Sequence, residues 1–183
     1  MLIEILCDKF IDHGRPRGRI PVYSGLNVVL GSDSGSNSIG KSTFLMIIDF
    51  IFGGTDYIDR LTDVQTEVGV HTIFFTFAFE NGLYHFGRST GEYNKVYRCN
   101  SDYDILEGKD LSLDDYTDFL SREYKLNLFG LILCNAIGRF IRVYKRETLD
   151  EEHPLHQAKQ ETAKVAIEGL LKILDLYSGI AEQ

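Results

Sequence analysis

One short stretch constrains this chain more than any other. Residues 35–42 read Gly-Ser-Asn-Ser-Ile-Gly-Lys-Ser and match the pattern G-x-x-x-x-G-K-[ST] at each fixed position. In this pattern the glycines allow a tight turn, and the backbone N–H groups of the loop point at phosphate oxygens. We expect Lys41 to reach the β- and γ-phosphates of ATP and the Ser42 hydroxyl to bind Mg²⁺. The expected nucleotide-binding residues are Gly35, Ser36, Asn37, Ser38, Ile39, Gly40, Lys41, Ser42 and Thr43.

The flanking residues support this hypothesis, because the motif requires a strand before it and a helix after it. Leu26–Leu30 is a short β-branched run that ends at a glycine, which predicts a buried strand. Residues 44–52 are apolar except for Asp49, and Gly53-Gly54 follows, which predicts a buried helix with a glycine C-cap. A chance Gly/Ser-rich loop is the alternative interpretation.

Composition narrows the class of protein further. The formal net charge of −8 over 183 residues argues against a surface coated with nucleic acid, although a local basic patch stays open. The three cysteines are widely spaced and are expected to be reduced core thiols: Cys7, Cys99 and Cys134. With no signal-peptide pattern and no apolar run of bilayer length, we expect a cytoplasmic protein without a membrane anchor.

The sequence predicts a mixed α/β (α+β) chain with an antiparallel meander. A hairpin is expected where two β-rich runs, 71–80 and 83–88, flank Asn81-Gly82, a dipeptide that favours a type I′ turn. Further strands are expected at residues 2–7, at 95–99, and at 20–23 as an edge strand because of Pro21.

Helices are predicted in the second half of the chain. Ser112 to Asp115 resembles a capping box that starts a helix running to about Tyr124. A second, mostly apolar helix is expected at 126–137, and a third, amphipathic helix at 157–177. Residues 55–70 are polar and weakly patterned, so a mobile loop is expected there.

Several polar groups allow two interpretations. The arginines of the loop 12–19 either lie in a solvated turn, or one of them contacts a nucleotide phosphate. The basic residues that follow the second helix form either a solvated face or a contact to DNA or nucleotide phosphates. These residues are Arg15, Arg17 and Arg19, then Arg139, Arg142, Lys145 and Arg146. His153 and His156 suggest a metal site, but two histidines without further ligands seldom form one.

Residues 40–45, Gly-Lys-Ser-Thr-Phe-Leu, together with Phe50-Ile51-Phe52-Gly53, resemble the SMC, RecF and RecN group of ABC-type ATPases. The resemblance implies a P-loop NTPase lobe over residues 1–150, with ATP and Mg²⁺ as ligands. It also implies that 151–183 is a helix beginning a coiled coil or other helical excursion.

The chain departs from that family at several positions. Gly31-Ser32-Asp33-Ser34 lengthens the loop, and no glutamine lies near 135–140, where Asn135 is only a weak stand-in for the family's metal–water contact. Neither an apolar strand ending in Asp-Glu (Walker B) nor a Leu-Ser-Gly-Gly signature is found. The resemblance is therefore to the N-terminal half of an ATPase head.

Three functions follow as hypotheses. The first is the ATP-binding lobe of an SMC-like ATPase in DNA repair, chromosome maintenance or DNA defence, with no catalytic residue of its own. It would become a hydrolase when completed by a C-terminal half or a second chain, would form an ATP-dependent homodimer, and would have DNA as a further partner. The second is a small P-loop kinase or phosphotransferase, and the third is a non-catalytic interaction module.

Overall fold

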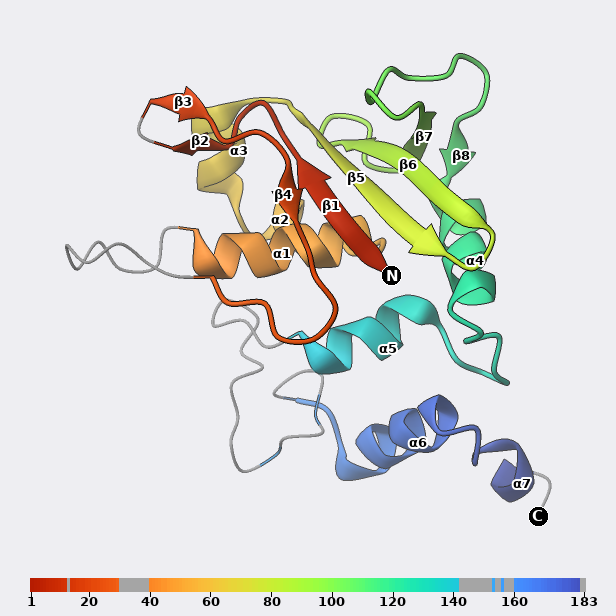
Figure 1. Ribbon diagram of the computed structural model, residues 1–183. Helices are drawn as coiled ribbons and strands as arrows, with labels where there is room; N and C mark the ends of the chain where they lie inside the picture. The colour runs from red at the N-terminus through yellow and green to blue at the C-terminus, as the bar shows by residue number, and fades with distance from the viewer. Residues whose placement is uncertain (13, 30–39, 142–152, 154–155, 157–159, 182–183) are drawn as a thin grey trace. The chain divides into compact units, whose positions relative to one another are not determined.

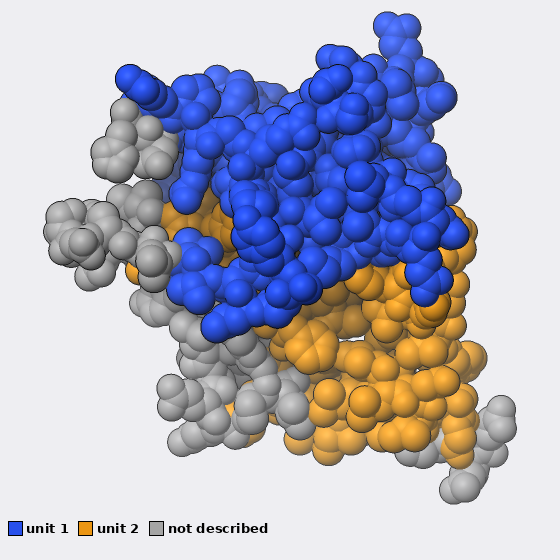
Figure 2. Space-filling model, in the orientation of Figure 1, with its two compact units in different colours: residues 1–30, 61–116 blue, residues 31–60, 117–183 orange. Residues whose placement is uncertain are grey.

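The computed structural model describes residues 1–12, 14–29, 40–141, 153, 156 and 160–181 (Figure 1). The chain divides into two compact units, one of residues 1–30 with 61–116 and the other of residues 31–60 with 117–183 (Figure 2). Together the elements form a mixed α+β fold. The expected division near residue 150 stays a prediction.

The first unit contains a six-stranded sheet in the order β4-β1-β5-β6-β7-β8 (Figure 1). The strands are β1 (Leu2–Leu6), β4 (Ile20–Pro21), β5 (Thr72–Phe79), β6 (Gly82–Ser89), β7 (Lys95–Cys99) and β8 (Leu111–Ser112). Every strand pair in the described part of the chain is antiparallel. The predicted meander is confirmed, and so is the edge position of the strand that contains Pro21.

One face of this sheet forms the core of the first unit. Ile5, Phe75 and Phe86 are cross-strand neighbours on β1, β5 and β6, and all are buried. Tyr116 packs on the same face, with its ring centroid 5.3 Å from that of Phe86 and 6.2 Å from that of Phe75. Alternation along the strands therefore leaves Glu4, Thr76 and His85 on the opposite face.

The β5–β6 hairpin forms as predicted, but its turn differs by one residue. Phe79 pairs with Gly82, so the loop consists of Glu80 and Asn81. Neither loop residue has a positive φ, whereas Gly82 has φ 132°. The type I′ prediction is wrong, because that turn requires positive φ at both central residues.

Two predicted loops contain regular structure. The segment 12–19 is part of a small hairpin of β2 (Ile11–Asp12) and β3 (Arg15–Pro16). The segment 55–70 forms α2 (Asp56–Asp59) and α3 (Thr62–Val68). Although the segment is mostly polar, the side chains of Tyr57 and Leu61 are buried. The expectation of a mobile loop is therefore wrong.

The second unit is helical. It contains α1 (Lys41–Ile51), α2, α5 (Leu133–Phe140), α6 (Ala163–Ile173) and α7 (Ser178–Ala181), and α4 (Leu113–Glu123) enters it from the first unit. The predicted start of α4 is confirmed: the Asp115 N–H donates to the Ser112 hydroxyl at 3.1 Å, and this hydroxyl donates to the Asp115 carboxylate at 2.6 Å. None of the described helices combines the length and the apolar character that a bilayer crossing demands.

The other two predicted helices begin later than expected. The helix predicted at 126–137 starts at Leu133, because Lys125 (φ 58°) and Gly130 (φ 69°) adopt left-handed conformations that interrupt a helix. The helix predicted at 157–177 starts after Thr162, whose hydroxyl accepts from the Val165 N–H. It ends before Asp175, which has φ 56°, and residues 157–159 lie outside the described part.

Candidate functional site

The candidate nucleotide site begins where α1 begins. Gly40 is the N-cap residue and has φ 127°, a conformation that favours glycine. Lys41 is exposed, and Ser42 and Thr43 are half-buried in the first turn. That turn contains no acidic residue, and no side chain caps it. The geometry suits an anion, because the first N–H groups of a helix carry a partial positive charge.

The helix is held in place by its apolar residues. Met46, Ile47, Phe50 and Ile51 are buried, and the Phe50 ring lies 5.7 Å from the ring of Tyr57 on α2. Gly53 follows with φ 103°, so the predicted buried helix with a glycine end is confirmed. The five loop residues before Gly40, namely Gly35, Ser36, Asn37, Ser38 and Ile39, lie outside the described part.

The strand predicted before the motif is not formed in residues 26–29, and Leu30 lies outside the described residues. The Asn27 side chain instead accepts from the Tyr23 N–H at 2.9 Å and donates to the Tyr23 carbonyl at 2.8 Å. Such local side-chain bonds compete with strand pairing. Leu26, Val28 and Val29 are 89%, 66% and 47% exposed, so the prediction of a buried strand is wrong for residues 26–29.

The structure separates the two residues proposed to bind Mg²⁺. Asn135 follows Cys134, whose Sγ lies 3.9 Å from the carbonyl oxygen of Phe52, just beyond the C-terminal end of α1. Ser42 lies at the other end of that helix, about 15 Å from Phe52 at 1.5 Å per residue. Of the Asn135 side chain nothing is described, so of the two residues only Ser42, the last residue of the motif, is placed at the start of α1.

Most of the basic candidates are either paired or undescribed. Arg19 donates to Glu4 at 3.0 Å, and Arg139 donates to both carboxylate oxygens of Glu161. Arg15 and Arg17 are exposed, while Arg142, Lys145 and Arg146 lie outside the described residues.

The rings of His153 and His156 lie 4.8 Å apart. Within the described ranges, no group of three His, Cys, Asp or Glu residues could hold a metal ion.

Comparisons with known proteins assign no family or function to the chain. No protein-family model, curated protein or solved structure matches the chain.

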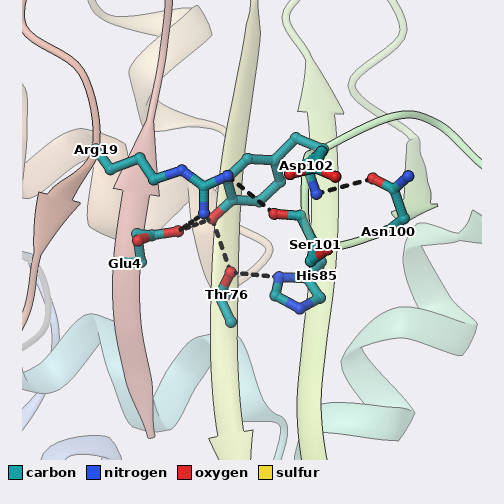
Figure 3. A network of polar contacts seen from close by, with 8 residues as sticks. Glu4, Arg19, Thr76, His85, Asn100, Ser101 and Asp102 are labelled. Carbon is teal, nitrogen blue, oxygen red and sulfur yellow. Dashed lines mark hydrogen bonds and ion pairs between the residues drawn. The ribbon is translucent and has the colours of Figure 1, made fainter.

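A cluster of hydrogen-bonded polar side chains lies within the first unit, on the face of the sheet opposite its core (Figure 3). The Tyr103 hydroxyl donates to Glu4 at 2.7 Å and lies 2.7 Å from the Thr76 hydroxyl. Thr76 in turn lies 2.8 Å from Nδ1 of His85. Glu4 pairs with Thr76, and Thr76 with His85, across β1, β5 and β6, so the strand register brings these side chains together.

Tyr103 is the centre of this network, and no pattern in the sequence marks Tyr103, Glu4, Thr76 or His85 as functional residues. Tyr103 is buried and has φ 67°, which is unusual for an aromatic residue and costs about 1–3 kcal/mol. The Arg19 guanidinium lies 4.9 Å from its ring centroid, and the Phe74 ring lies 5.4 Å from it. Burial raises the pKa of the Tyr103 hydroxyl, which therefore stays protonated at neutral pH. No local pattern joins Glu4 to a residue 99 positions away.

Proposed function

We propose that this chain is the ATP-binding N-terminal lobe of an SMC-like ATPase. The observation that carries the proposal is the start of α1, where Gly40 in a left-handed conformation leads directly into Lys41 and Ser42. A lysine and a hydroxyl on the first turn of an uncapped helix are the groups that phosphate and Mg²⁺ require. The antiparallel meander that follows α1 also agrees with the resemblance.

In this role each residue of the motif would contact a different part of Mg-ATP. Lys41 and the first N–H groups of α1 would hold the β- and γ-phosphates, and the Ser42 hydroxyl would hold Mg²⁺. When bound, the metal would neutralise phosphate charge. The remaining loop, Gly35 to Ile39, would surround the phosphates, as the motif requires.

The exposed segment 26–29 supports the idea that the lobe needs a partner. Leu26, Val28 and Val29 are apolar and two of them are β-branched, yet they have no strand partner among the described residues. Apolar residues left in water are a cost that pairing with another segment would remove. We therefore propose that a C-terminal half, or a second chain, supplies strands beside them, together with the missing acidic pair and signature. Head engagement driven by ATP, formation of a homodimer, and action on DNA in repair, chromosome maintenance or defence follow from this role.

Replacement of one residue tests the nucleotide site. Lys41→Ala is expected to remove most binding of Mg-ATP or Mg-ADP, because the mutation deletes a charge-assisted phosphate contact. Isothermal titration calorimetry would measure the affinity. Lys164→Ala is the control, since that side chain is exposed on α6, far along the chain from the motif. Equal affinity in parent and Lys41→Ala would refute the nucleotide-binding role.

A further inference from the structure

The network around Tyr103 has only one arrangement of protons that satisfies each of its hydrogen bonds. Glu4 accepts from Arg19 at 3.0 Å and from the Tyr103 hydroxyl at 2.7 Å, as a carboxylate does. Since the single Tyr103 proton points to Glu4, the Tyr103 oxygen must accept from Thr76 at 2.7 Å. The single Thr76 proton is then used, so the 2.8 Å contact with His85 requires a proton on Nδ1 of His85.

This order of donors determines the state of the imidazole. With Nδ1 protonated, neutral His85 carries its lone pair on Nε2. No protein hydrogen bond to Nε2 of His85 is found among the residues that the structure describes. In many enzymes, one ring N–H of a histidine is held by hydrogen bonds that lead to a carboxylate. The other ring nitrogen then acts as a base or nucleophile.

We infer that Glu4, Tyr103, Thr76 and His85 form a proton relay that makes Nε2 of His85 a nucleophilic site for activated carbonyl compounds. The strand register holds the relay together, because three of its members occupy one cross-strand row and the fourth, Tyr103, is buried beside them. This site does not depend on nucleotide binding at α1, and it lies entirely in the first unit.

The reaction with diethyl pyrocarbonate illustrates the step. The Nε2 lone pair attacks a carbonyl carbon, an N–C bond forms, and the C–O bond to the ethyl carbonate leaving group breaks. The ethyl carbonate anion then hydrolyses to ethanol and bicarbonate. The Nδ1 proton passes to Thr76 as the Thr76 proton passes to Tyr103 and the Tyr103 proton to Glu4, so the acylated ring is neutral.

Nuclear magnetic resonance of ¹⁵N-histidine-labelled protein tests the relay directly. In the parent, neutral His85 is expected as the Nδ1–H tautomer. In Tyr103→Phe the freed Thr76 proton can donate to Nδ1, so the Nε2–H tautomer is expected to replace it. Thr76→Val is expected to lose the Nδ1–H preference, whereas Thr76→Ser keeps the hydroxyl and is expected to retain it. An Nε2–H tautomer in the parent would overturn the inference.

Reactivity provides the second measurement. Mass spectrometry after brief treatment with diethyl pyrocarbonate would follow modification at each histidine, and His85→Gln would confirm the assignment. His85 in the parent is expected to react faster than in Tyr103→Phe or Thr76→Val by about tenfold, the lower end of the effect that losing an outer hydrogen-bond partner has on a metal-bound histidine. Thr76→Ser should react at the parental rate. Equal rates in folded parent, Tyr103→Phe and Thr76→Val, with folding checked by circular dichroism, would reject the nucleophilic site.

Discussion

At the scale of single residues, the contact with Asp49 explains why residue 54, just after the end of α1, is a glycine. Asp49 is buried on α1, and the Gly54 N–H donates to the Asp49 carbonyl at 2.9 Å. A Cβ on Gly54 would overlap the Asp49 carboxylate. The chain therefore has no space for a side chain where it turns away from α1.

Gly54→Ala is accordingly expected to destabilise the fold by about 1–3 kcal/mol, the usual cost of overpacking a filled site. Urea unfolding followed by circular dichroism would measure the change. Gly179→Ala on α7 is a matched control, since nothing lies within 4 Å of its added Cβ. A Gly54→Ala protein as stable as the control would show that Asp49 can move aside without cost.

The buried cysteines make a second prediction at this scale. Burial is the largest cause that raises the pKa of the Cys7 and Cys99 thiols to about 11, from an ordinary 9.0. As pH rises above 9, the unfolded chain loses these protons before the folded chain does. Ionisation then favours unfolding, so the stability that these thiols contribute is lost as the pH approaches about 11.

Urea unfolding from pH 8 to pH 11 would measure this loss. The double variant Cys7→Ala, Cys99→Ala should lose less stability over that range than the parent, because other groups titrate equally in both proteins. Parallel pH profiles of the two proteins would contradict the assignment.

At the scale of elements, a nearly buried ion pair joins Arg139 of α5 to Glu161, which lies just before the N-cap residue of α6. The guanidinium of Arg139 lies 2.9 and 3.2 Å from the two carboxylate oxygens of Glu161, and the side chains are 8% and 10% exposed. A Cβ on Gly169 of α6 would overlap this guanidinium, so α6 has a glycine where the arginine passes. Arg139 therefore has a role in packing, whereas the sequence alone allows either a solvated face or a phosphate contact for this residue.

Glu161→Gln is expected to destabilise the protein by about 3–5 kcal/mol, because it leaves a buried guanidinium without its charged partner. The pair Lys164–Glu168 on α6 offers the control, because its side chains are 85% and 32% exposed, and Glu168→Gln should change stability by less than about 1 kcal/mol. Thermal unfolding of both variants would give the comparison. Similar losses in the two variants would mean that the Arg139–Glu161 pair contributes no more than a surface pair.

At the scale of the whole molecule, we expect this chain to bind ATP without hydrolysing it. Hydrolysis needs a group that positions the attacking water, and the sequence contains no acidic pair after an apolar strand for that role. Phosphate release by the purified chain should therefore stay at background. Robust hydrolysis that Ser42→Ala abolishes would show that a catalytic acid is present and unrecognised.

The sequence by itself determined the elements whose signals are local. The β-rich runs on either side of Asn81-Gly82 predicted β5 and β6, with β7 as the next strand of the meander. The capping-box pattern predicted the start of α4, and the apolar run before Gly53-Gly54 predicted α1. These signals suffice because residue preferences, turn dipeptides, caps and glycine stops act within a few residues. The motif that ends at Ser42 is equally local, and its role in binding ATP stays a prediction.

Only the tertiary structure decided which side chains meet. A turn centred on Asn81-Gly82 would have paired Thr76 with Gly87, whereas the observed loop of Glu80 and Asn81 pairs Thr76 with His85. The Tyr103–Glu4 bond spans 99 positions, and residues 26–29 lack a strand because Asn27 bonds locally and no described strand pairs with them. Such outcomes depend on the register and on which partners are within reach, and neither is written in a local pattern.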